Sequence, residues 1–189
     1  MSKHRRQVMV VAALSALALT LIASATVVMA ARWAGQFTGG GQATVDEEEK
    51  KGPPVGTQIT FGVDGKVDLL KARGDGDLVD DTGATILGHG TWVDHSEDPP
   101  RVFRLQTPTS YRCRPTGPRG TSSISGLGTD SGRPGEPVFI RMGTDDSDPD
   151  TVRIRAHEGD PPTRDTKVYY KANAAVVDGQ VIRHSCQLP

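Results

Sequence analysis

The sequence contains few aromatic residues and none of the common catalytic motifs. Only 5% of its 189 residues are aromatic, and no basic stripe is interleaved with them, which argues against a nucleic-acid-binding surface. The GxSxG, HExxH and glycine-rich phosphate-loop motifs are also absent. These absences exclude the enzyme classes that depend on such motifs. They leave open an enzyme whose polar residues converge only after folding.

Cysteine is scarce as well, because the chain contains only Cys113 and Cys186. Without a CxxC spacing, and with His184 as the only nearby imidazole, the sequence offers too few ligands for a zinc site. In an oxidising compartment a single pair is most simply a disulfide, and the alternative is two unpaired thiols. We predict a disulfide that joins the middle of the chain to its C-terminal tail.

Long apolar runs are missing except at the N-terminus. Residues 1–7 contain three basic side chains and no acidic one, and residues 8–31 contain no charge. This pattern is typical of an export signal. The run is long enough to span a bilayer, but small residues ending at Ala25 or Ala30 also suit signal peptidase. We expect residues 1–31 to form one hydrophobic helix, either a cleaved signal peptide or a retained membrane anchor, with residues 32–189 outside the cytoplasm.

Residues 32–189 have the pattern of a β-rich domain. The chain contains 22 glycines and 13 prolines, which favour frequent turns. Apolar and polar residues alternate along several segments, so that Val152, Ile154 and Ala156 should face inward while Arg153 and Arg155 face outward. About eight to ten short strands predict an antiparallel β-sandwich, or a partly open barrel, with loops rich in Gly, Pro and Asp.

Two Asp-Gly pairs help to divide these strands. Asp64-Gly65 interrupts an alternating segment and predicts a hairpin turn, with a short helix from Lys66 to Ala72 as the competing interpretation. Asp178-Gly179 predicts another turn, after which GQVIRHS supplies the last strand.

The segment TDDSDPDTVRIRA, from Thr144 to Ala156, raises the question of a calcium site. Asp146, Asp148 and Asp150 alternate as the ligands of a calcium loop do, but no glycine occupies the sixth position of such a loop. Asp, Ser and Pro are also the residues that form turns without a metal. A β-hairpin tip is the preferred interpretation and calcium the alternative. No other cofactor is expected.

The motif GHGTWVDH contains the residues that most resemble a catalytic site, His89 and His95. On one strand they would stand roughly 20 Å apart, too far to share a metal. Asp94 could orient the imidazole of His95 for general-base catalysis, but adjacent residues of a strand face opposite ways. The alternative is a strand with polar residues at its ends. No catalytic residue is assigned.

A resemblance to a known family accompanies these patterns. The motifs FTGGGQATV, ITFGV, GHGTWVDH, SGLGTD, DDSDPDTVRIR and GQVIRHS occur in an order that resembles the exported microbial domains called post-COAP. The resemblance spans Phe37 to His184 and implies an all-β domain on secreted or surface proteins, without an established catalytic activity. Apparent insertions, DEEEKKGPP and TGPRGTSS, and the SDPD sequence depart from the family pattern.

Two classes of function follow from the sequence. The first is a non-catalytic secreted or surface-anchored module that binds an envelope component, either a protein or a glycan. The second is a small extracytoplasmic hydrolase or metal-dependent enzyme with a site around His89 and His95 or the aspartate-rich loops. The exported part holds 19 basic and 23 acidic residues, so neither nucleic acid nor anionic lipid is an expected partner. Membrane contact would come from the N-terminal helix, if it is not cleaved.

Overall fold

The computed structural model describes residues 33–115, 120–146, 149–159 and 163–188. The prediction of an all-β domain is confirmed, because the described ranges contain ten strands and no helix. The predicted export helix, residues 1–31, lies outside these ranges. No helix in the described part is long and apolar enough to cross a bilayer.

The ten strands belong to one compact unit, Ala34–Pro189. They are, in chain order, β1 (Gly35–Val45), β2 (Gln58–Val67), β3 (Leu70–Ala72), β4 (Leu78–Asp80), β5 (Ile86–Asp94), β6 (Arg101–Cys113), β7 (Gly120–Asp130), β8 (Val138–Asp146), β9 (Thr151–Glu158) and β10 (Lys167–Cys186).

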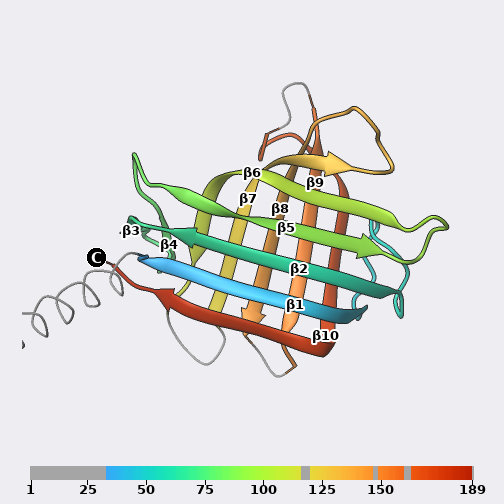
Figure 1. Ribbon diagram of the computed structural model, residues 1–189, viewed down its shortest axis with the longest axis horizontal. Helices are drawn as coiled ribbons and strands as arrows, with labels where there is room; N and C mark the ends of the chain where they lie inside the picture. The colour runs from blue at the N-terminus through green and yellow to red at the C-terminus, as the bar shows by residue number, and fades with distance from the viewer. Residues whose placement is uncertain (1–32, 116–119, 147–148, 160–162, 189) are drawn as a thin grey trace, which may run out of the picture. The chain divides into compact units, whose positions relative to one another are not determined.

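Eight of these strands form a closed antiparallel barrel (Figure 1). The order around the barrel is β1-β2-β5-β6-β7-β8-β9-β10, and β10 pairs with β1 to close the ring. In the sequence, the short strands β3 and β4 lie between β2 and β5. They form a hairpin, and β4 pairs with the end of β6. The predicted β-sandwich is therefore wrong, and the alternative, a partly open barrel, is right about the barrel but wrong about the opening. Apolar and polar residues alternate along the strands of both architectures. A sandwich and a closed barrel differ in whether the last strand pairs with the first.

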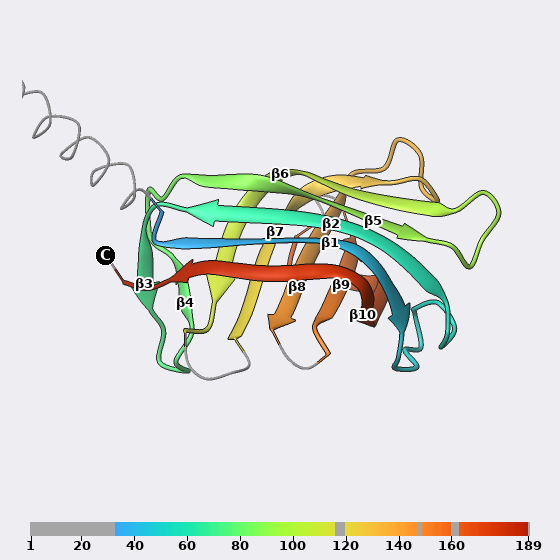
Figure 2. The same ribbon diagram turned by 60° about the horizontal axis from the view of Figure 1, so that its bottom comes forward.

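Closure depends on two long strands that change partners along their length. The first half of β10 pairs with β9 and the second half with β1, and Figure 2 shows the strand bending between them. Strand β6 pairs with β5 from Arg101 to Leu105, and it pairs with β4 at Arg112 and Cys113. Irregularities on either side of Thr107 and Pro108 interrupt its ladder with β7. Bulges bend a strand, and proline has no N–H for the ladder, so this segment forms a corner.

The two predicted Asp-Gly turns are wrong, because both pairs lie inside continuous strands. Asp64 and Gly65 are part of the regular ladder between β2 and β5, and no helix follows. Gly179 lies opposite Gly41 next to a bulge, with a φ of 114° that other residues rarely adopt. The chain therefore bends at Asp178-Gly179 without reversing, and β10 is one strand of 20 residues where two short ones were expected.

The inward face of the barrel is filled by large apolar side chains. The largest fully buried ones include Trp92, Tyr111, Phe37, Phe103, Ile59, Leu105, Ile124, Ile140 and Ile154. Gly65 and Gly88 face each other on β2 and β5, and the side chain of Ile124 from β7 occupies the space they leave. A Cβ on Gly88 would lie 2.8 Å from Cδ1 of Ile124. Gly88 of the motif GHGTWVDH therefore leaves space for a core side chain.

The predicted disulfide is present. Cys113 ends β6 and Cys186 ends β10, and their Cα atoms are 6.0 Å apart. The bond connects residues 73 positions apart in the sequence. It fastens the end of β10 to β6, which lies on the opposite side of the ring, with three strands between them in either direction.

Candidate functional site

The histidines singled out in the sequence are not brought together. The His89 side chain is 75% exposed, and its Nδ1 lies 2.5 Å from Oδ1 of Asp64 on the neighbouring strand. Nε2 of His95 lies 3.0 Å from Oγ1 of Thr60. His89 lies within β5 and His95 directly follows its last residue, so a stretch of extended strand separates the two imidazoles. A shared site at His89 and His95 has no geometric support.

Asp94 does not orient His95 either, because its carboxylate points into the barrel. The side chain is buried, and its Oδ2 accepts a hydrogen bond of 2.8 Å from the hydroxyl of Tyr170. That hydroxyl in turn accepts a bond of 3.1 Å from Nε1 of Trp92. Burial, followed by the nearby carboxylate, raises the pKa of Tyr170. The motif therefore contributes its Trp and Asp to a buried hydrogen-bonded chain.

The aspartate-rich segment is described only in part. Oδ2 of Asp150 accepts a hydrogen bond of 3.1 Å from the backbone N–H of Val181 on β10, 31 residues away in the sequence. Asp148 and the side chain of Asp146 lie outside the described atoms, so calcium at these three residues stays a prediction. Among the described residues, no three acidic, histidine or cysteine side chains are grouped so that they could hold a metal ion.

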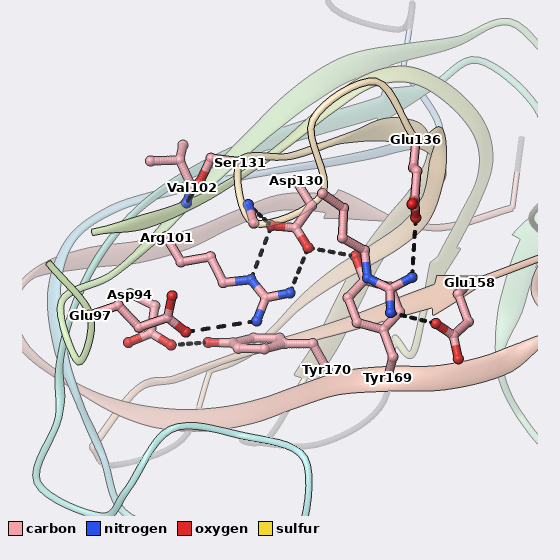
Figure 3. A network of polar contacts seen from close by, with 12 residues as sticks. Asp94, Glu97, Arg101, Val102, Asp130, Ser131, Glu136, Glu158, Tyr169 and Tyr170 are labelled. Carbon is pink, nitrogen blue, oxygen red and sulfur yellow. Dashed lines mark hydrogen bonds and ion pairs between the residues drawn. The ribbon is translucent and has the colours of Figure 1, made fainter. Parts of the chain in front are cut away.

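A polar network at one rim of the barrel joins residues far apart in the sequence (Figure 3). Arg101, at the start of β6, donates from Nε and Nη2 to the two carboxylate oxygens of Asp130, at 3.0 and 2.7 Å. The Tyr169 hydroxyl donates to the same carboxylate at 2.8 Å. The Arg101 guanidinium also lies over the rings of Phe103 and Tyr170, which places a cation on aromatic faces.

The network satisfies its own charges. Burial acts to raise the pKa of Asp130, but hydrogen bonds from Arg101, Gly132 and Tyr169 outweigh it, and the pKa lies below its ordinary value. Arg133 pairs with Glu158 at 2.6 Å and with Glu136 at 3.3 Å. Because every charged group here has a partner, the network has the properties of a structural connection between strand ends.

A second polar cluster, on the outer wall formed by β6 to β9, is organised differently. A hollow of about 270 Å³ lies there, and we call it the arginine hollow. Its lining contains five arginines, namely Arg112, Arg114, Arg141, Arg153 and Arg155, together with Asp77 and small polar residues of β7 and β8. On β8 and β9 the arginines alternate with core residues, so their side chains point away from the barrel interior.

Strand register explains why the arginines meet. Arg141 on β8 is directly opposite Arg155 on β9, and Arg153 is opposite Gly143. Ser123 on β7 lies opposite Gly143 of β8 on one side and opposite Arg112 of β6 on the other. Arg112, Ser123, Gly143 and Arg153 therefore form one row across the four strands. Gly143 has no side chain and Ser123 a small one, so the middle of the row is open while long cationic side chains stand on both sides.

Aspartates from the β3–β4 hairpin neutralise one side of the hollow. Asp77 pairs with Arg112 and with Nε of Arg114, the latter at 2.6 Å, and Asp75 lies 2.9 Å from Nη2 of Arg112. On the other side, Arg153 lies 3.4 Å from Asp145. Asp75 and Asp77 are thus partners of arginine, whereas Asp80 accepts a hydrogen bond from the backbone N–H of Tyr111 and Asp81 pairs with Lys71.

Arg141, like Arg155 opposite it, has no acidic partner among the described residues, whereas the other three arginines of the hollow each have one. The one hydrogen bond of Arg141 to a described residue runs from Nη2 to the Ser123 hydroxyl, at 3.2 Å, and Arg141 forms no ion pair within the described ranges. Burial, followed by the positive charges of Arg112 and Arg155, lowers the pKa of Arg141 to about 10. A partly buried cation among like charges is unfavourable unless something else compensates it.

Sequence reasoning anticipated part of this cluster. The alternation over β9 predicts Arg153 and Arg155 on the outer face, and both are there. Arg112 and Arg141 could not be assigned to the cluster from the sequence, because they lie on strands other than β9. Only the register of β6 to β9 places them beside the others.

Comparisons with family models, with curated proteins and with solved structures found no match to this chain. The resemblance to the post-COAP family therefore stays a prediction.

Proposed function

We propose that the protein is a non-catalytic, extracytoplasmic binding module whose outer barrel wall holds a component of the cell envelope. The observation that carries the proposal is the placement of the chemically capable residues. His89 and His95 are apart, Asp94 is held by Tyr170, and the barrel interior is packed with apolar side chains. An enzyme needs a nucleophile or base next to a space for substrate, and none of these residues borders one.

The alternative, a small hydrolase or metal-dependent enzyme, finds less support. The network of Figure 3 contains carboxylates, tyrosines and two arginines, which are possible catalytic groups. These groups bind one another, whereas a catalytic acid or base must be able to reach a substrate proton. The network is best explained as a connection between strand ends.

The Cys113–Cys186 disulfide is consistent with a location outside the cytoplasm, where such bonds persist. Together with the charge and hydropathy pattern of residues 1–31, it supports export as a secreted or membrane-anchored protein.

The proposal can be tested by co-sedimentation with envelope fragments. The full chain, purified from cells that export it, is mixed with envelope fragments from the same cells and centrifuged. We expect saturable binding to the pellet. Fragments digested with protease and fragments digested with glycan hydrolases separate a protein receptor from a glycan. A protein that stays in the supernatant with every preparation would contradict the proposal.

A further inference from the structure

The arginine hollow carries more positive charge than its own aspartates balance. Five arginines line it, and three aspartates, Asp75, Asp77 and Asp145, pair with them. Counted over the described residues, two positive charges are therefore left in excess. The aspartates bind Arg112, Arg114 and Arg153, so the excess falls on Arg141 and Arg155.

Arg141 and Arg155 are cross-strand partners. Directly opposite side chains of antiparallel strands have Cβ atoms about 5 Å apart, and like charges in that position repel. An anion placed between the two guanidinium groups would turn this repulsion into two favourable pairs. The hydrogen bond from Arg141 to Ser123 already holds one guanidinium at the edge of the hollow.

The geometry suits an oxyanion with several acceptor oxygens. Guanidinium groups present paired N–H donors that match phosphate or carboxylate oxygens, and an excess of two charges matches the phosphate dianion better than one carboxylate. A phosphate monoester carries about −1.5 to −2 charge at neutral pH and three acceptor oxygens. Gly143 and Ser123 leave the middle of the row open for such a group.

We propose that the arginine hollow binds a phosphate group, with Arg141 and Arg155 as its principal ligands. This inference rests on the proposed function and names the chemistry that the binding module recognises. The phosphate would stand on an envelope polymer or lipid headgroup, or would be free inorganic phosphate. The bound anion would also supply Arg141 with the negative partner that the described residues do not provide.

Calorimetric titration of the full chain tests the proposal, with inorganic phosphate and glycerol phosphate as probes and acetate as the carboxylate control. We expect one site per chain, with phosphate bound about tenfold or more tightly than acetate because phosphate carries more negative charge and more acceptor oxygens to share between the two guanidinium groups. Binding of both phosphate probes indicates a phosphate ester as the natural ligand, and binding of inorganic phosphate alone indicates the free ion. No saturable phosphate binding, or acetate bound equally well, overturns the proposal.

Variants separate a specific site from general charge. Arg141→Gln should weaken phosphate binding about tenfold or more, and Arg141→Lys should restore only part of it because lysine has no paired donors. Arg104, an exposed arginine of β6 opposite Thr91 and Thr129, serves as the matched control. Arg104→Gln removes the same charge outside the hollow and should leave binding within about twofold, since surface charges are largely screened by salt. Equal weakening by Arg104→Gln and Arg141→Gln overturns the proposal. Melting curves show whether each variant is folded.

Sedimentation of the same variants with envelope fragments distinguishes this inference from the proposed function. Loss of envelope binding in Arg141→Gln, but not in Arg104→Gln, supports both. If every variant still sediments with the envelope while none binds phosphate, the module function stands and the phosphate site is wrong. If phosphate binds at the hollow but no form of the protein sediments, the site stands and the envelope function is wrong.

Discussion

At the scale of single residues, the chain contains two kinds of arginine. Arg101 is held in a bidentate pair with Asp130 and lies over aromatic rings, so its charge is compensated on all sides. Arg141 is partly buried with arginines around it and only a serine hydroxyl as a described partner. The first arrangement stabilises the folded protein, whereas the second lowers its stability when no anion is bound in the arginine hollow.

This contrast predicts opposite effects of the same substitution. Arg141→Gln should raise the free energy of unfolding in phosphate-free buffer by about 0.5 kcal/mol, because it removes like-charge repulsion. Arg101→Gln should lower it by about 3 kcal/mol, because it leaves the Asp130 carboxylate buried without its cation. Urea denaturation followed by circular dichroism measures both values. Destabilisation of similar size by both would contradict this account of Arg141.

Acid should weaken the protein through Asp130. Its pKa is lower in the folded than in the unfolded state, so the folded state loses its advantage as protons bind. The stabilisation is complete above the unfolded pKa of about 3.9 and disappears as the pH falls through the folded value. We expect the free energy of unfolding to decrease steeply below about pH 4. Asp130→Asn should flatten that decrease, in denaturation curves measured between about pH 2 and 7. If the free energy of unfolding decreases as steeply in this variant, other carboxyl groups, such as Glu158, cause the loss of stability in acid.

At the scale of elements, glycine positions decide where strands bend. Gly179 combines a φ of 114° with close contact to the backbone of Gly40 and Gly41 on β1. A side chain there would disturb both the backbone conformation and the β1–β10 pairing that closes the barrel.

Gly179→Ala should therefore lower the free energy of unfolding by about 1–3 kcal/mol. Gly62→Ala is the matched control, since Gly62 also lies in a strand but has no atom within 4 Å of the added Cβ and no positive φ. We expect the control to change stability by less than about 0.5 kcal/mol. Chemical denaturation of the two variants gives the comparison. Similar losses in both would mean that strand propensity, and not the bend, controls the effect.

The elements also show how far sequence reasoning reaches. The strands around Ile140 and Ile154 were predictable, because each alternates apolar and polar residues over its own length. Barrel closure was not, since it depends on bends at Pro108 and Gly179 that resemble strand ends in the sequence. The arginine hollow was half predictable for a similar reason. Arg153 and Arg155 share one strand, whereas Arg141 joins them only through cross-strand register.

At the scale of the whole molecule, the disulfide is the one covalent cross-link of the chain. It closes a segment of 73 residues that includes β7, β8, β9 and all of β10, which ends at Cys186. Fixing the ends of that segment reduces the freedom of the unfolded chain.

Replacing both Cys113 and Cys186 by serine should lower the free energy of unfolding by about 4 kcal/mol in the loop-entropy account. The double variant should keep the β-type circular dichroism spectrum while its urea midpoint falls. Labelling of the unaltered protein with a thiol reagent tests whether Cys113 and Cys186 are joined before the substitutions are made. Free thiols in protein recovered from outside the cytoplasm would contradict the predicted oxidised state.

Mass spectrometry of the protein from the cells that make it tests the predicted export. A mature N-terminus at Thr26 or Ala31 would identify residues before it as a cleaved signal peptide. An intact chain that begins at Met1 and fractionates with membranes would identify an anchor. A soluble intact chain in the cytoplasm would contradict export altogether.

The closed ring also limits how other polypeptides can attach to this protein. In the described part of the chain, every strand of the ring has a neighbour on both sides, although β10 pairs with β9 only through Ala175 and with β1 only from Ala174. A partner therefore finds no terminal strand of the ring at which to extend the sheet, and the lack of such a strand also protects against fibril growth. Recognition has to depend on side chains, so affinity for any partner should respond to point substitutions on the wall more than to the length of the partner's extended segment.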